Sequence, residues 1–144
     1  RAGADSALGG CGVTGIDAGG RSGRRVAIVT GATGAIGSAT ARRLVAVGWD
    51  VAVVGRDSGR IDALAAELGP TAAGFIADAT VSADLDAAVA AIVERLGPPD
   101  ALVHAVGSTL LKPVHAVSDA ELDDVLAVNL LSAVYIQTSV HPEH

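Results

Sequence analysis

The segment whose residue types most clearly suggest chemistry is Thr30-Gly31-Ala32-Thr33-Gly34-Ala35-Ile36-Gly37. It follows the apolar run 26–29 and precedes a helical pattern that extends to about Val47. At such a position an open α/β sheet presents a helix N-terminus, whose N–H groups and dipole favour a pyrophosphate. The glycines permit a tight turn, close approach of backbone to phosphate, and close packing of helix on strand. We therefore predict a nucleotide-binding turn formed by Gly31, Thr33, Gly34, Ala35, Ile36 and Gly37.

The residues that follow the second apolar run, 51–54, indicate whether the nucleotide-binding turn accepts NAD or NADP. An NAD site usually places an acid at this point, whereas an NADP site places an arginine against the 2′-phosphate. Asp50 precedes the run and is expected at the far edge of the sheet, while Arg56 and Asp57 follow it at the ligand edge. Because a guanidinium suits a phosphate well, the pattern favours NADP over NAD. The alternative is that Arg56 is a solvated loop residue and Asp57 the cap of the next helix.

Asn129 is the only asparagine of the chain, and it shares a predicted helix face with Leu122, Val125, Leu126, Leu130 and Ala133. A buried amide must find hydrogen-bond partners, and asparagine is a poor residue for a helix interior. We therefore expect either a hydrogen bond that helps pack the helix or a functional role for Asn129. His104 follows three apolar residues of a predicted buried strand, and we expect it to be a hydrogen-bonded core histidine rather than a catalytic one.

The elements that position these residues alternate between strand and helix. Short apolar runs at 26–29, 51–54, 74–77 and 101–106 predict buried parallel strands. Amphipathic stripes between them predict helices, two of which end at Gly69-Pro70 and Gly97-Pro98. Ser118 and Glu121 have the spacing of a capping box and open a long last helix. The alternation predicts an open α/β sheet of parallel strands with helices on both faces.

Composition excludes several classes of protein. Half of the residues are hydrophobic, but the chain has one each of Phe, Trp and Tyr, too few rings for a base-stacking platform. The net charge of −6 argues against nucleic acid or an anionic membrane as partner. No apolar run approaches the roughly 20 residues of a membrane span, and no signal-peptide core is recognisable. Since Cys11 stands alone, no internal disulfide can form, and we expect a cytoplasmic protein.

Residues 1–24 are rich in Gly and Ala without periodicity and predict a flexible leader, followed by a partial nucleotide-binding domain over 25–144. From Arg25 to about Val140 the chain resembles the first half of a short-chain dehydrogenase/reductase. The matching segments are Thr30-Gly31 to Gly37, Val53 to Asp57, Asp78-Ala79-Thr80, Leu102 to Gly107 and Val128-Asn129-Leu130. The glycine spacing 31, 34 and 37 resembles the extended branch of the family, and His104-Ala105-Val106-Gly107 replaces the family's Asn-Asn-Ala-Gly.

The resemblance implies a Rossmann-type, doubly wound parallel sheet that is truncated after the fourth strand and the following helix. It also implies an NAD(P) cofactor and hydride transfer between a carbonyl and an alcohol of a small molecule. It implies that Asp78 contacts the adenine, that Ala79 contacts the adenosine, and that Ala105, Val106 and Gly107 lie near the cofactor's ribose. It also implies that Asn129 is the helix asparagine of the catalytic tetrad. The serine and the Tyr-x-x-x-Lys of that tetrad are absent, because Tyr135 is followed by Ser139 and Lys112 precedes Tyr135.

Three hypotheses follow. The chain is the cofactor-binding portion of a short-chain oxidoreductase and inactive by itself, or a nucleotide-sensing module without catalysis, or a nonfunctional truncation. Because the chain contains no methionine, we expect it to be either a processed chain or a fragment of a longer reading frame. An apolar edge strand at 101–106 and an incompletely covered last helix predict self-association.

Overall fold

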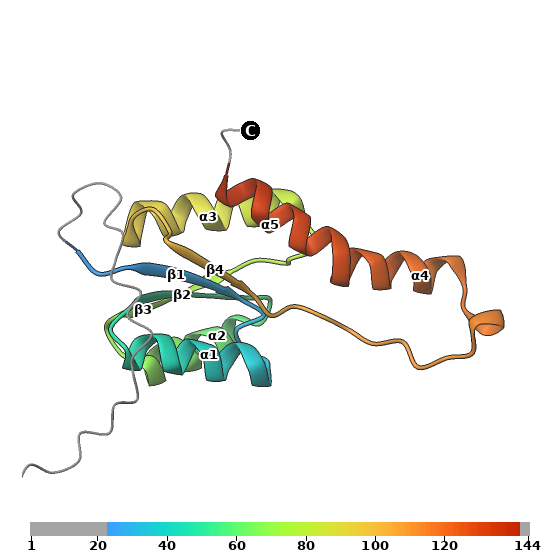
Figure 1. Cartoon of the computed structure of the whole chain (residues 1–144), viewed down its shortest axis with the longest axis horizontal. Coiled ribbons are helices and arrows are strands. Elements are labelled where there is room, and N and C mark those ends of the chain that lie inside the picture. The colour runs from blue at the N-terminus through green and yellow to red at the C-terminus, as the bar shows by residue number, and fades with distance from the viewer. Residues whose placement is uncertain (1–22, 142–144) are drawn as a thin grey trace, which may run out of the picture.

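The computed structural model describes residues 23–141 and contains a central sheet of four parallel strands (Figure 1). The strands are β1 (Val26–Thr30), β2 (Asp50–Gly55), β3 (Ala72–Ile76) and β4 (Ala101–His104). Their order in the sheet is β3-β2-β1-β4, which confirms the predicted parallel α/β architecture of the Rossmann type. The predicted leader, residues 1–24, lies outside the described residues except for its last two.

The sheet is held together by strands that are apolar on both faces. Every residue of β1 is buried, because β1 pairs with β2 on one side and with β4 on the other. Val29 lies beside Val53 of β2 and Val103 of β4. The register brings the carboxyl ends of the strands to one edge of the sheet, where the loops that follow them converge.

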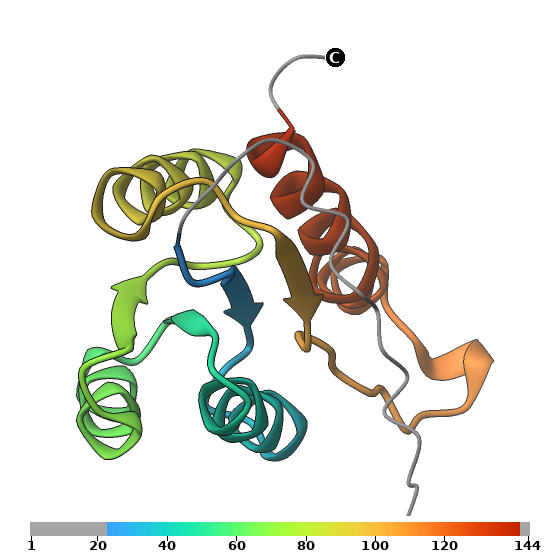
Figure 2. The ribbon, with the colours of Figure 1, turned by 60° about the vertical axis from the view of Figure 1, so that its left-hand side comes forward.

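Helices cover both faces of the sheet (Figure 2). The helices α1 (Ala35–Ala46) and α2 (Ser58–Leu68) pack on one face, and α3 (Ser82–Leu96) and α5 (Ser132–Val140) pack on the other. Alternate residues of β2 face opposite layers: Val51 and Val53 contact the first pair, while Ala52 and Val54 contact the second. Burial of each of the three valines contributes about 1.5–3 kcal/mol, so the alternation stabilises the sheet between two helical layers.

Most predicted element boundaries hold to within two residues. Gly69 and Gly97 end α2 and α3 with positive φ angles of 91° and 93°, as the sequence predicted. Three predictions were wrong in detail. β3 spans Ala72–Ile76 rather than residues 74–77. β4 ends at His104 rather than at residue 106, because the chain turns away there to border a pocket. Val93, assigned to the buried stripe of α3, is 39% exposed.

The last helical run has an unpredicted change of pitch. A 3₁₀ turn, η1 (Val114–Ala116), precedes α4 (Asp119–Leu126), which continues through the π-helical turn η2 (Ala127–Leu131) into α5. The capping box of Ser118 and Glu121 at the start of α4 is confirmed. Two side chains at η2 donate to main-chain carbonyls of the preceding turn. Asn129 donates to the carbonyl of Val125 at 2.9 Å, and Ser132 donates to that of Val128 at 2.6 Å. Such side-chain bonds compete with the regular α-helical pattern.

α4 projects away from the sheet (Figure 1). Leu122, Leu126 and Leu130 are 50%, 43% and 54% exposed, which confirms the predicted incompletely covered apolar stripe. The expectation that Asn129 is buried on this face was wrong, because its side chain is exposed. No helix among residues 23–141 has both the length and the apolar character needed to cross a bilayer.

Candidate nucleotide-binding site

The turn between β1 and α1 brings the backbone unusually close to its neighbours at two glycines. Gly31 has a φ of +65°, and a Cβ there would lie 2.5 Å from the carbonyl oxygen of Ala105. At Gly37 a Cβ would collide with the carbonyl oxygen of Gly31 and approach the Cα of Ala32 to 2.9 Å. Any side chain would therefore separate the turn from the β4 loop or α1 from β1. The tight turn predicted for Gly31 and the close packing predicted for Gly37 are confirmed.

The N-terminus of α1 is not capped by a side chain. Gly34 occupies the N-cap position in extended conformation, and the first turn of α1 contains no acidic residue. The N–H groups of a first helical turn have no partner within the helix, and the dipole adds partial positive charge there. This helix end can therefore accept an anion such as a phosphate.

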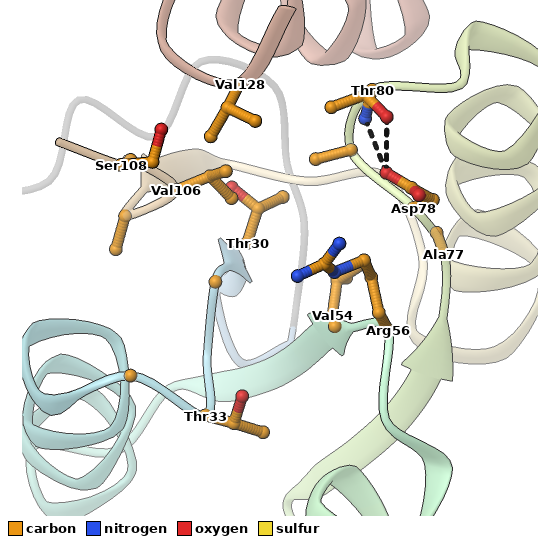
Figure 3. Close-up of a pocket in the computed structure, with 16 residues that line it drawn as sticks. Thr30, Thr33, Val54, Arg56, Ala77, Asp78, Thr80, Val106, Ser108 and Val128 are labelled. Atoms are coloured by element: carbon orange, nitrogen blue, oxygen red, sulfur yellow. Dashed lines mark hydrogen bonds between the residues drawn. The ribbon is translucent and has the colours of Figure 1, made fainter. Parts of the chain in front are cut away.

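A hollow of about 350 Å³ lies over the carboxyl ends of the strands, in front of this helix end (Figure 3). Its wall is formed by the β1 turn and by the loops after β2, β3 and β4, with one residue from η2. The lining residues are Thr30, Gly31, Thr33, Gly34, Val54, Gly55, Arg56, Ala77, Asp78, Ala79, Thr80, Ala105, Val106, Gly107, Ser108 and Val128.

Nine of the residues predicted to bind cofactor line this pocket. They are Gly31, Thr33, Gly34, Arg56, Asp78, Ala79, Ala105, Val106 and Gly107. Ala35, Ile36 and Gly37 lie further along α1 and do not line it. Asp57 is also outside the pocket: its carboxylate accepts a hydrogen bond of 3.0 Å from the backbone N–H of Arg60 and caps α2. The structure thus gives Asp57 the capping role that the sequence left open.

Sequence reasoning missed seven lining residues. They are Thr30, Val54, Gly55, Ala77, Thr80, Ser108 and Val128. Thr30, Gly55 and Ala77 end or directly follow a strand, so the rule that ligands bind at the carboxyl ends of parallel strands could have found these three. No local signal marks Val128, because it reaches the pocket only through the packing of the last helical run.

Opposite charges face each other across the pocket. Figure 3 shows the guanidinium of Arg56 directed into the hollow, with Asp78 on the wall formed by the loop after β3. Asp78 accepts hydrogen bonds from the hydroxyl of Thr80 at 2.7 Å and from its N–H at 2.9 Å. These bonds, with a smaller contribution from the charge of Arg56, hold the pKa of Asp78 below its usual value. Asp50 lies at the opposite edge of the sheet, 3.0 Å from Arg24.

Known proteins resemble this chain in sequence and in overall fold. The family model described as short chain dehydrogenase matches residues 25–144. The chain belongs to the short-chain dehydrogenase family. Members of this family are oxidoreductases that use NAD(P).

Individual relatives match over about half of their own length. The short-chain reductase protein NovJ of Streptomyces niveus is 42% identical over 108 residues, which are 73% of this chain and 41% of NovJ. D-threitol dehydrogenase of Mycolicibacterium smegmatis is 36% identical over 109 residues, covering 74% of this chain and 42% of that enzyme. A solved actinorhodin polyketide ketoreductase variant with NADPH superimposes with a TM-score of 0.78 at 35% identity, over 81% of this chain and 46% of that one.

In this short-chain dehydrogenase chain, Asn129 joins the last helical run to the β4 loop. Its Oδ1 accepts a bond of 3.0 Å from the N–H of Ser108, and its Nδ2 donates to Val125 and, at 3.3 Å, to the hydroxyl of Ser108. Asn129 does not itself line the pocket, but it holds Ser108, which does. The structure therefore shows the packing role of Asn129, and its catalytic role stays a prediction.

The remaining polar candidates are engaged in the fold. His104 is half-buried and hydrogen-bonded through both ring nitrogens, which confirms the expected hydrogen bonding, and partial burial lowers its pKa. Tyr135 packs against the core formed with α3, and Lys112 lies 2.9 Å from Glu121. Among residues 23–141, no cluster of three His, Cys, Asp or Glu side chains could hold a metal ion.

Proposed function

We propose that this chain is the cofactor-binding portion of an NADP(H)-dependent short-chain oxidoreductase that interconverts a carbonyl and an alcohol of a small molecule. The observation that carries the proposal is the uncapped N-terminus of α1 facing the same 350 Å³ hollow as the guanidinium of Arg56. The printed names of the relatives, reductases and dehydrogenases, support the reaction class. The NADPH named with the ketoreductase structure supports the cofactor class.

The residues present fit a dinucleotide. The absence of a Cβ at Gly31 lets the backbone approach, and the first turn of α1 offers N–H groups to a pyrophosphate. Asp78 and Ala79 would border the adenosine, and Ala105 to Gly107 would lie along the ribose. The bound dinucleotide supplies the hydride. The residues of this chain bind and orient it.

Arg56 supports NADP(H) over NAD(H). Arg56 directly follows β2 at the ligand edge of the sheet and lines the pocket. The pocket lining contributed by the end of β2 and the loop after it contains no acidic residue. Asp50, the acid nearest to the expected spacing, begins β2 at the opposite edge, where it pairs with Arg24. A guanidinium facing a 2′-phosphate forms charge-assisted hydrogen bonds, whereas NADH offers only hydroxyls at that point.

Titration calorimetry with NADPH and NADH tests this assignment. We expect NADPH to bind more tightly, and Arg56→Ala to weaken NADPH binding roughly tenfold or more while leaving NADH nearly unchanged. Arg43→Ala is the matched control, because Arg43 is an exposed arginine in the last turn of α1, away from the pocket. Equal affinity for both dinucleotides before and after the Arg56 substitution would contradict the assignment.

We further propose that the chain by itself binds dinucleotide without turnover. Tyr135 is packed against the core and Lys112 is paired with Glu121, so neither is placed to donate a proton to a developing alkoxide. The same observation favours the second candidate function, a nucleotide-sensing module. We expect NADPH oxidation with a panel of aldehydes and ketones to stay at the uncatalysed rate; reproducible oxidation that copurifies with the chain would overturn this.

Self-association is the remaining part of the proposal. The apolar stripe of α4 and η2 is exposed, and β4 pairs with β1 on one side only among the described strands. An apolar edge strand and an apolar helix face both favour pairing with a second copy.

A further inference from the structure

A chain of hydrogen bonds runs from the end of β1 to the π-helical turn. Oγ1 of Thr30 lies 2.7 Å from Nδ1 of His104, and Nε2 of His104 lies 3.0 Å from Oγ of Ser132. The hydroxyl of Ser132 then donates to the carbonyl oxygen of Val128 at 2.6 Å. Thr30 is 1% and Ser132 0% exposed, so neither hydroxyl has water as an alternative partner.

The bond between Ser132 and Val128 determines which group donates and which accepts in each of the other two hydrogen bonds. Because Ser132 gives its single hydroxyl hydrogen to Val128, its oxygen can only accept from His104. Nε2 of His104 must therefore carry the proton, and Nδ1 of the neutral ring is an acceptor. Thr30 then donates its hydroxyl hydrogen to Nδ1. His104 is the one member that both accepts from β1 and donates to the helix.

The two ends of the chain lie in the pocket wall. Thr30 directly precedes Gly31 of the nucleotide-binding turn, and Val128 lines the pocket from η2. We propose that His104 is a positioning residue, which holds the nucleotide-binding turn and the π-helical turn in register through a hydrogen-bond chain of fixed direction. The effect of His104 on ligand binding rests on the proposed function, because that function names the ligand of the pocket. The hydrogen bonds themselves do not depend on it.

This arrangement has a chemical consequence for the ligand. The hydrogen of the Thr30 hydroxyl is committed to His104, so Thr30 can offer only lone pairs to a bound molecule. An anionic oxygen finds no donor there, and phosphate binding is left to the backbone N–H groups of the turn. Removal of His104 would leave the buried hydroxyl hydrogen of Thr30 without an acceptor, while Ser132 would keep only its bond to Val128. Because an unpaired buried hydroxyl is costly, we expect the surrounding segments to shift.

The first test reads the chain of bonds without any cofactor. Nitrogen-15 NMR of the His104 ring should show the proton on Nε2 at neutral pH, and Ser132→Ala should disturb this preference. His104→Leu should shift the amide signals of Gly31 and Val128, at opposite ends of the chain, whereas His115→Leu, at an exposed histidine, should not. A proton on Nδ1, or unmoved Gly31 and Val128 signals, would overturn the proposal.

The second test measures dissociation constants for NADPH. His104→Leu should weaken binding roughly tenfold, and His104→Gln, whose amide can both accept and donate, should restore most of the loss. If the Leu variant fails to fold, the comparison is made between Gln and the unsubstituted chain, together with Thr30→Val, which should weaken binding without loss of fold. Equal affinities for the Leu and Gln variants, or for Thr30→Val and the unsubstituted chain, would contradict a positioning role. Failure of the unsubstituted chain to bind NADPH would instead refute the proposed function, and the NMR test would still decide the chain of bonds.

Discussion

Asp78 shows how one local motif sets the charge of the pocket wall. Its carboxylate accepts both the N–H and the hydroxyl of Thr80, two residues further on, and faces the cation of Arg56. Because these partners favour the ionised form, the pKa of Asp78 lies below its usual value. Asp78 therefore keeps its negative charge to a lower pH than an ordinary aspartate would.

Replacement of Thr80 by valine should raise the pKa of Asp78 toward its ordinary value, since the hydroxyl bond is the largest cause of the shift. A lowered carboxyl pKa contributes stability above the ordinary value of about 4, which is lost as the pH falls through the folded-state value. In the Thr80→Val variant the ionised Asp78 should therefore contribute less to the free energy of unfolding, and this smaller contribution should be lost at a higher pH than in the unsubstituted chain. Carbon-13 NMR titration of the carboxyl measures the change.

Thr138→Val is the control for this titration, because the hydroxyl of Thr138 bonds only to the carbonyl of Tyr135 in α5. The pKa of Asp78 should not move in that variant. An Asp78 pKa that is the same with and without the Thr80 hydroxyl would contradict the assignment.

At the scale of elements, the position of α1 depends on the missing side chain of Gly37. The helix starts so close to β1 that a Cβ would collide with the main chain of Gly31 and Ala32. A Cβ on Gly34, three residues earlier, would lie 3.4 Å from the carbonyl oxygen of Gly31, an ordinary contact, and Gly34 has a negative φ. The two glycines therefore differ sharply in what they tolerate.

We expect Gly37→Ala to lower the free energy of unfolding by about 1–3 kcal/mol, the usual cost of overpacking, because the obstacle is backbone and cannot rotate away. Gly34→Ala should cost clearly less. Urea denaturation of both variants measures the difference. If the two substitutions destabilise equally, the close approach of α1 to β1 is not what requires glycine at position 37.

The elements differ in how well the sequence predicts them. Strands and helices over residues 25–97 were predictable because apolar runs and stripes are bounded by Gly and Pro, which act locally. The π-helical turn was not, because it depends on Ser132 and Asn129 bonding to carbonyls and on the β4 loop that Asn129 holds. The partners of His104 were also hidden, since Thr30 and Ser132 lie 74 and 28 residues away in the sequence.

At the scale of the whole molecule, α4 and η2 project from the sheet and expose the apolar side chains of Leu122, Leu126 and Leu130 (Figure 1). We expect the chain to self-associate, with the apparent mass in static light scattering rising with concentration. The triple substitution Leu122→Gln, Leu126→Gln and Leu130→Gln should reduce this rise, because it removes the apolar face without changing charge. Val47→Gln, at an exposed valine next to α1, is the control. A monomer at all concentrations in the unsubstituted chain would contradict the expectation.

The central claim is that the carboxyl edge of the sheet binds a dinucleotide, and amide chemical-shift mapping with NADPH tests it most directly. The account predicts saturable shifts at the β1 turn, at Arg56, in the Asp78–Thr80 loop and in the β4 loop up to Ser108. It predicts unmoved signals for Gly48, Gly69 and Gly97, which lie in turns outside the pocket. Absence of saturable shifts, or shifts centred on those three glycines, would contradict it.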